Sequence, residues 1–299
     1  MIGSLAWVTT AAARGHDEDE PIALRALARA GVKVSVVDWD DPNVDWSGFD
    51  RAILRSAWDY PDRLEEFLAW LDVVAASTDL VNPPQIVRWS LDKRYLAELA
   101  GAGLPITPTD FLIPGDSCRL PSGRFVVKPA VGAGSRDAAS YGPDQHPAAT
   151  RHVEGLHALG RTVLVQPFLP SIPELGEWPM VFIDGEFTHA AHKRVSLPEA
   201  GLIGELFAAE ENSSHQATDG QRTVAQWVVD HLSARVGVPA YARVDLVVGL
   251  DGQPCVLEVE LAEPSLFLPF ASEQAIDRLV HVCTRDAQGR PDRMPASRP

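Results

Sequence analysis

Cysteine is scarce in this 299-residue chain, which contains three cysteines. No two of them form a CxxC pair, and an odd number of widely spaced cysteines does not suggest a disulfide framework. We therefore expect Cys118, Cys255 and Cys283 to be reduced thiols with structural roles.

Long apolar runs and an excess of positive charge are also absent. No stretch approaches the roughly 18 apolar residues of a membrane span, and the start of the chain lacks the basic and apolar segments of a signal peptide. Lys and Arg number 26 against 41 Asp and Glu, so the net charge is −15. This surplus argues against general binding to nucleic acid or acidic membranes. We expect a cytoplasmic protein with a small-molecule partner and no nucleic-acid or membrane partner, and leave homo-oligomerisation open.

What the N-terminal part does contain is an alternation of strand and helix signals. Strands are predicted over 4–10 (SLAWVTT) and 32–40 (VKVSVVDWD), where β-branched residues are frequent. Between them, the segment DEDEPIALRALARAG begins with acidic residues and ends at a glycine, as helices do. The alternation predicts a parallel α/β unit.

Polar residues beyond the strands of this unit are candidate substrate contacts, because open α/β sheets bind ligands at the carboxyl ends of their strands. Arg55 is a candidate for bidentate binding of a substrate carboxylate. Asp17, Glu18 and Asp59 are candidates for an amino group. For each of the four residues, the alternative is a helix cap, a surface charge or a structural ion pair.

The remaining segments contain fewer regular alternations. A single helix is expected over 90–103 with Ser90 as its N-cap, and a β unit rich in Gly and Pro follows it. Two hairpins are then predicted, over 178–194 and 240–261. We divide the chain into an N-terminal α/β domain (1–84), a linker helix with a small subdomain (85–165), a C-terminal subdomain with a metal site (166–285) and a loose tail (286–299).

The second hairpin carries an unusual set of charges within two apolar strands. Arg243 and Asp245 are two residues apart in ARVDLVV, and Glu258 and Glu260 are two apart in CVLEVEL. Side chains two apart on a strand share one face of the sheet. Three carboxylates on one face repel each other unless a cation lies between them. Hard oxygen ligands of this kind suit Mg²⁺ or Mn²⁺, whereas the alternative is a polar, solvent-facing sheet surface.

A glycine-rich segment, RFVVKPAVGAGSRD, follows another predicted strand. Lys128 ends the strand, and Gly132, Gly134 and Ser135 follow it. Glycines allow backbone N–H groups to approach phosphate oxygens, and the lysine would add a positive charge. The segment matches neither the P-loop nor the dinucleotide-binding fingerprint, so an ordinary hairpin loop is the alternative.

Two further strand ends carry groups suited to a nucleotide. In TVLVQPFLP, the Gln166 carbonyl and the Phe168 N–H are candidates for the acceptor and donor that an adenine edge requires; a strand that simply ends at proline is the alternative. In AAHKRVS, Lys193 and Arg194 lie just past a predicted strand, where the alternative is a solvated basic end.

Taken in order, the segments LDKRYL, FVVKPAVGAGS, VLVQPFL, GEW, ARVDLV and LEVELAEPSLF resemble the ATP-grasp superfamily of carboxylate-activating ligases. The resemblance covers roughly residues 85–270. It implies an α/β fold, α+β in the nucleotide-binding part, in which a parallel α/β unit is followed by two α+β subdomains that grip ATP.

The resemblance also implies roles for individual residues. It assigns nucleotide contacts to Lys93 and Lys128 (phosphates), Gly132, Gly134 and Ser135 (covering loop), Gln166 and Phe168 (adenine), and Glu174 or Glu177 (ribose). It assigns the metal to Asp245, Glu258 and Glu260, and catalytic contacts to Arg243 and to Lys193 or Arg194.

ATP and Mg²⁺ are the implied cofactors, with two ions expected and Mn²⁺ able to substitute, and the implied chemistry is activation of a carboxylate as an acyl phosphate. The chain is similar to the cyclo-ligases of D-cycloserine biosynthesis, which implies closure of O-ureido-D-serine to D-cycloserine. An intermolecular carboxylate–amine ligase and a nucleotide-binding protein without catalysis are the alternatives. Glu263 and Ser265 are candidate substrate contacts, and 132–135 and 198–214 are candidate lids.

Overall fold

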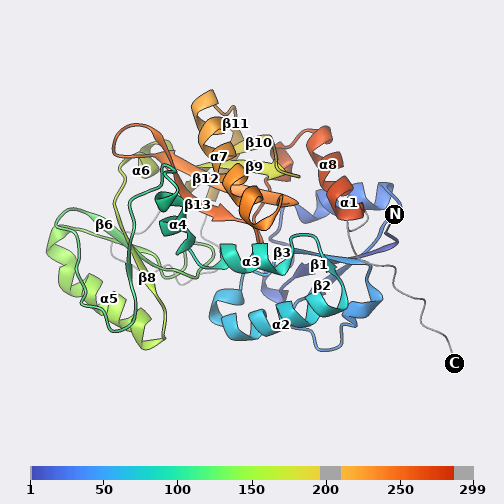
Figure 1. Cartoon of the computed structure of the whole chain (residues 1–299), viewed down its shortest axis with the longest axis horizontal. Helices are drawn as coiled ribbons and strands as arrows, with labels where there is room; N and C mark the ends of the chain where they lie inside the picture. The colour runs from blue at the N-terminus through green and yellow to red at the C-terminus, as the bar shows by residue number, and fades with distance from the viewer. Residues whose placement is uncertain (1, 196–209, 286–299) are drawn as a thin grey trace.

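The computed structural model describes residues 2–195 and 210–285. Three sheets lie along the longest axis of the molecule, and helices cover them (Figure 1). No helix in these two ranges is long and apolar enough to cross a membrane. Residues 198–209 of the expected lid and the expected tail (286–299) lie outside the described residues.

The N-terminal sheet is parallel, as the alternation predicts, and its strand order is β2-β1-β3-β4. Both faces are buried: Trp7 and Ile53 pack toward α1 and α8, and Phe67 and Trp70 of α2 cover the other face. Burial on both faces explains why β1 is a nearly continuous apolar run and why the middle of β3 is apolar. The elements are β1 (Ser4–Thr9), α1 (Glu20–Arg29), β2 (Lys33–Asp38), β3 (Arg51–Ser56), α2 (Leu64–Ser77), β4 (Asp79–Leu80) and α8 (Glu273–Thr284).

The prediction of a single helix over 90–103 is wrong. Two helices occupy this region, α3 (Pro84–Leu91) and α4 (Tyr95–Gly101). Ser90 therefore lies near the end of α3 and is not an N-cap. The chain breaks between the helices because the Lys93 N–H donates to the Ala130 carbonyl (2.9 Å). This corner directs the Lys93 side chain toward the site described below.

The middle sheet is antiparallel, with the order β5-β8-β6-β7. Phe125, Val127 and Val163 pack against Val153 of α5 in a small core of their own. The sheet lies at the end of the molecule farthest from the N-terminal sheet (Figure 1). Its elements are β5 (Asp110–Leu112), β6 (Phe125–Pro129), β7 (Ala139–Tyr141), α5 (His146–Ala158) and β8 (Val163–Pro167).

The third sheet lies between the other two and has the order β11-β10-β9-β12-β13. Both expected hairpins are present, and Asp184 and Gly185 (φ 57° and 75°) form the turn of the first. Residues 210–214 of the expected lid belong to an edge strand, β11. The elements are α6 (Ser171–Leu175), β9 (Trp178–Ile183), β10 (Glu186–Val195), β11 (Glu210–His215), α7 (Asp219–Val236), β12 (Tyr241–Val248) and β13 (Pro254–Glu260). The boundaries proposed for the domains stay predictions.

Candidate active site

Two cavities meet beside the β12–β13 hairpin. The larger, about 740 Å³, lies between the middle and third sheets, and the smaller, about 300 Å³, lies between the hairpin and the N-terminal domain. A ligand group in one can therefore reach a group in the other. The two cavities share the side chains or backbone of Lys93, Gly132, Ala133, Gly134, Lys193, Glu210, Glu258 and Glu260.

The hairpin brings its four charged residues onto one face, as their spacing predicts. Arg243 lies opposite Glu260 and Asp245 lies opposite Glu258. The Arg243 guanidinium binds both oxygens of Asp245, each at 2.8 Å, and also contacts Glu260. Asp245 is thus buried behind the arginine, whereas Glu258 and Glu260 line both cavities.

The two glutamates differ in their protonation. Burial raises the pKa of Glu260 to about 7; Arg243 opposes the shift, and the nearby Glu258 and Asp245 add to it. Burial also disfavours the ionised form of Glu258, but the ammonium groups of Lys93 and Lys128 outweigh this and lower its pKa. Glu260 is therefore a carboxylate whose ionised form needs a further cation.

The donor set fits a divalent cation that arrives with phosphates. No three His, Cys, Asp or Glu side chains within residues 2–195 and 210–285 form a cluster that could hold a metal ion. Mg²⁺ is usually bound by one or two carboxylates together with substrate phosphates and water. Glu258 and Glu260 can supply the first part of such a shell, with Asp245 held behind them.

Two lysines face the larger cavity in different states. The Lys93 ammonium bonds Glu258 Oε1 and the Gly132 carbonyl, each at 2.8 Å. The Lys128 ammonium makes no hydrogen bond or ion pair with another described residue. Burial lowers the pKa of Lys128, and the positive charges of Lys93 and Lys193 lower it further, against the effect of Glu258 and Glu177. An anionic ligand group would relieve this unpaired charge.

The glycine-rich segment after β6 lines both cavities. Gly134 (φ 62°) and Ser135 (φ 59°) adopt left-handed backbone conformations. A Cβ atom at Gly132 would approach Pro129 Cγ to 3.2 Å. The loop therefore lies close against the end of β6, where its backbone can cover a ligand bound by Lys128.

The adenine end of the larger cavity differs in one respect from the expectation. Gln166 and Phe168 do line the cavity. The Phe168 N–H, however, already donates to the Arg124 carbonyl (2.9 Å), so the expected adenine donor is wrong. The Leu169 N–H also lies in this wall and has no hydrogen-bond partner among the described residues, which makes it the available donor. The Arg124 guanidinium, not expected from the sequence, stacks 3.8 Å from the Phe168 ring centroid.

The structure separates the two ribose candidates. Glu177 lines the larger cavity, whereas Glu174 is exposed on α6 and outside both cavities. Lys193 lies 3.4 Å from Glu177 and 3.6 Å from Glu210, a residue that the sequence did not single out. Arg194 lines the larger cavity only, so Lys193 is the residue that also reaches the smaller one.

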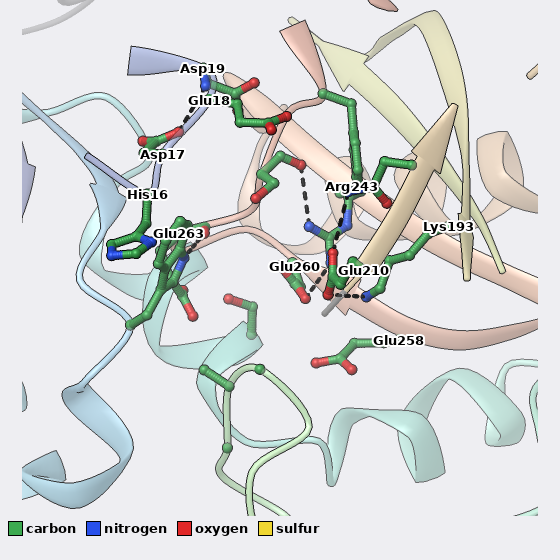
Figure 2. Close-up of a pocket in the computed structure, with 18 of the residues that line it drawn as sticks. His16, Asp17, Glu18, Asp19, Lys193, Glu210, Arg243, Glu258, Glu260 and Glu263 are labelled. Atoms are coloured by element: carbon green, nitrogen blue, oxygen red, sulfur yellow. Dashed lines mark hydrogen bonds and ion pairs between the residues drawn. The ribbon is translucent and has the colours of Figure 1, made fainter. Parts of the chain in front are cut away.

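The smaller cavity is the candidate acceptor site, and Figure 2 shows its acidic wall. The expected contacts Asp17, Glu263 and Ser265 line it. Three other lining residues received no individual role from the sequence, although they belong to the segments HDEDE and RSAWDY that follow β1 and β3, where ligands are expected. These are His16, Trp58 and Tyr60.

Two expected substrate contacts lie elsewhere. Arg55 is 1% exposed and its Nη2 atom is 3.0 Å from the Asp19 carboxylate, so it lies beneath the cavity in a buried ion pair. Asp59 accepts hydrogen bonds from Thr10 Oγ1 (2.9 Å) and Trp39 Nε1 (2.8 Å). For both residues the alternative of a structural role is the one that the contacts favour.

Comparison with known proteins identifies the family to which this chain belongs. The family model "D-cycloserine synthetase DcsG, N-terminal domain" matches residues 5–82. The cycloserine biosynthesis protein DcsG of Streptomyces lavendulae is 38% identical in an alignment 288 residues long that covers 92% of this chain and 96% of that protein. The chain belongs to the DcsG family of ATP-grasp ligases. It is therefore an enzyme, a carbon–nitrogen ligase, as the sequence predicts.

Solved structures agree with this assignment to the DcsG family. The crystal structure of D-cycloserine synthetase DcsG matches with a TM-score of 0.87 at 38% identity, over 94% of this chain and 98% of the other. The D-alanine–D-alanine ligase of Bacillus anthracis, solved with ATP, matches at 0.62 and 13% identity over 94% and 96%. The ATP-grasp ligase PsnB, solved with a precursor variant, Mg and ADP, matches at 0.61 and 18% over 94% and 99%. The last two show the fold alone, and the predicted fold class is confirmed.

Proposed function

We propose that this enzyme uses ATP to activate the carboxylate of O-ureido-D-serine and closes the molecule to D-cycloserine. The observation that carries the proposal is the shared wall of the two cavities at Glu258 and Glu260. It allows a nucleotide in the larger cavity to present its terminal phosphate to a small carboxylate in the smaller one. Membership of the DcsG family supports the choice of substrate.

The larger cavity offers a group for each part of ATP. The Leu169 N–H and a carbonyl of the β8 end would bind the adenine edge, and Glu177 the ribose hydroxyls. Lys93, Lys128 and the glycine-rich loop would bind the phosphates. Positioning of this kind contributes most of the catalysis in phosphoryl transfer.

Glu258 and Glu260 would hold two Mg²⁺ ions with the phosphate oxygens, and Mn²⁺ suits the same oxygen donors. Bound there, the ions would neutralise charge on the transferring phosphoryl group. Asp245 acts through Arg243, because both of its oxygens bind the guanidinium. Arg243 and Lys193 lie where charge passes between the cavities, so they would stabilise the transferring group and the acyl phosphate.

The reaction has three bond exchanges. A substrate carboxylate oxygen forms a bond to the terminal phosphorus of ATP, and the bond to ADP breaks. The ureido nitrogen attached to oxygen then attacks the acyl carbon and displaces phosphate, which closes the ring. Water removes the carbamoyl group as carbon dioxide and ammonia. Water must stay away from the acyl phosphate before ring closure, or hydrolysis returns the substrate.

The test is to incubate the enzyme with O-ureido-D-serine, ATP and Mg²⁺ and to measure ADP and products by mass spectrometry. We expect ADP and D-cycloserine in equal amounts without any second amine. Turnover that requires an added amine would instead indicate an intermolecular ligase. If O-ureido-D-serine does not stimulate ADP release, the proposed substrate is wrong.

A further inference from the structure

The turn that follows β13 is held rigidly at the edge of the smaller cavity. Three of its carbonyl groups accept hydrogen bonds from side chains that are distant in sequence. The donors are Trp58 to Glu263 (3.0 Å), Arg55 to Pro264 (2.8 Å) and Arg243 to Ser265 (3.2 Å).

The N–H groups of the same turn are bound by a single carboxylate. Asp19 accepts from Leu266 N–H (2.5 Å) and Leu268 N–H (2.7 Å), and it also pairs with Arg55. Asp19 and Arg55 are each at most 2% exposed. The N-terminal domain therefore fixes the backbone from which the Glu263 side chain projects into the cavity.

The backbone groups of the turn have hydrogen-bond partners, whereas the Glu263 carboxylate has none among the described residues. It lines the smaller cavity, and the residue is 7% exposed. The carboxylate makes no hydrogen bond or ion pair with another residue in the described ranges. Burial raises the pKa of Glu263 to about 8, and the neighbouring Glu260 adds to the shift. A buried carboxylate without a partner costs stability, and a cationic ligand group would remove that cost.

The distribution of charge in the cavity indicates which cationic group this is. Lys193 lines both cavities, and Arg243 lines the smaller one and contacts Glu260, which lines both, so the reacting carboxylate must lie beside these two cations. In Figure 2, Glu263 lies on the opposite side of Arg243 from Lys193, as Asp17 and Glu18 do, although the charges of Lys93 and Arg243 still act on it. An α-amino acid carries its carboxylate and its ammonium group on the same carbon, so it matches both sides at once.

We infer that the Glu263 carboxylate binds the α-ammonium group of the substrate and that the cavity thereby selects zwitterionic α-amino acids. The inference rests on the proposed function only for the direction in which the substrate lies. Glu263 is then a specificity-determining residue, and the fixed turn beneath it sets its position without an induced change.

The first experiment measures binding without turnover. Calorimetry would titrate O-ureido-D-serine into the enzyme with Mg²⁺ and a non-hydrolysable ATP analogue. A hydrogen-bonded charge pair of this kind changes affinity by roughly 10- to 100-fold, so Glu263→Gln should weaken binding by that factor. The matched control is Glu273→Gln, which removes an exposed carboxylate on α8 and should leave substrate affinity unchanged. Nucleotide affinity should stay within about twofold in both variants, because Glu263 does not line the larger cavity.

The second experiment removes the other partner of the proposed ion pair, the ammonium group of the ligand. The deamino analogue, 3-(ureidooxy)propanoate, lacks the α-ammonium group. The wild-type enzyme should bind it as weakly as Glu263→Gln binds O-ureido-D-serine, and the variant should hardly distinguish the two ligands. Additive losses from the two changes would overturn the inference, as would equal affinity of wild type and Glu263→Gln for O-ureido-D-serine.

These outcomes separate the inference from the proposed function. Amino-acid binding that depends on Glu263, without ADP release, contradicts the proposed reaction and supports the inference. Normal turnover of the wild type, with a Glu263→Gln variant that changes kcat but not substrate affinity, supports the proposed reaction and contradicts the inference. If the wild type binds neither ligand, the inference is wrong. Glutamine has the size of protonated glutamate, so the variant should fold, and circular dichroism would verify this.

Discussion

The two cavities share a wall, yet each contains a buried ionisable group that has no partner among the described residues, and the two groups are of opposite sign when ionised. In the larger cavity it is the ammonium group of Lys128, and in the smaller it is the carboxylate of Glu263. The pKa of Lys128 is lowered and that of Glu263 is raised, in both cases chiefly by burial. Each cavity thus lacks the charge that its proposed ligand carries: a phosphate in one and an ammonium group in the other.

The paired charges nearby have the opposite character. Arg55 with Asp19, and Arg243 with Asp245, are buried ion pairs with short contacts. They leave little demand for a ligand, but they hold the hairpin and the turn in place. These two pairs position the site, and Arg243, which lines the smaller cavity, also faces the ligand, whereas Lys128 and Glu263 have only a ligand to pair with.

The largest expected effect comes from the wall between the cavities. Glu258→Gln should reduce kcat by roughly 100- to 1,000-fold, because it removes the charge that would hold Mg²⁺ against the transferring phosphate. The amide oxygen can still accept from Lys93, so the fold should persist. ADP release and thermal unfolding measure the two effects, with Glu273→Gln as the control. Near-normal turnover with Mg²⁺ would show that Glu258 is not a metal ligand.

A smaller effect is expected from the unpaired lysine. Lys128→Met should weaken binding of an ATP analogue by roughly 10- to 100-fold, which is the contribution of a charged hydrogen bond. Stability of the free enzyme should not fall, because burial disfavours the charged amine. Lysine occurs four times in the chain, and Lys33, exposed on β2, is the one outside the cavities. Lys33→Met is therefore the matched control, and equal nucleotide affinity in the two variants would contradict the role of Lys128.

The smallest expected effect is the pH dependence of the free enzyme. Because the pKa of Glu263 in the folded state, about 8, exceeds its ordinary value of 4.5, the folded state binds more protons between these values, and stability falls as pH rises through them. The Glu263→Gln variant has no ionisable group at this position, so its stability should not fall with pH for this reason. The Tm of the variant relative to wild type should rise by roughly 2–6 °C between pH 5 and pH 8.5. Thermal unfolding in EDTA without nucleotide measures it, and a difference independent of pH would contradict the shift.

The parts of the site that sequence predicts well are those with local spacing. Residues two apart on a strand must share a face, so Arg243 with Asp245, and Glu258 with Glu260, were predictable as one charged surface. The glycine-rich loop after Lys128 could also be predicted from the sequence, because its residues are neighbours in the chain. The predictions that failed concern partners that are remote. Arg55 bonds the Pro264 carbonyl 209 positions away, and the Phe168 N–H donates to the carbonyl of Arg124, the residue before β6.

By itself the sequence determined the family, the chemistry of the nucleotide cavity and the surplus of carboxylates on the hairpin. Those features depend on residue type and short spacing, which the chain carries at every stage of folding. Only the tertiary structure decided which charges are paired, because partners such as Arg55 with Asp19 and Lys93 with Glu258 are far apart in the chain. It placed Arg55 beneath the cavity and chose Glu177 over Glu174. It also left Lys128 and Glu263 without partners on either side of Glu258 and Glu260.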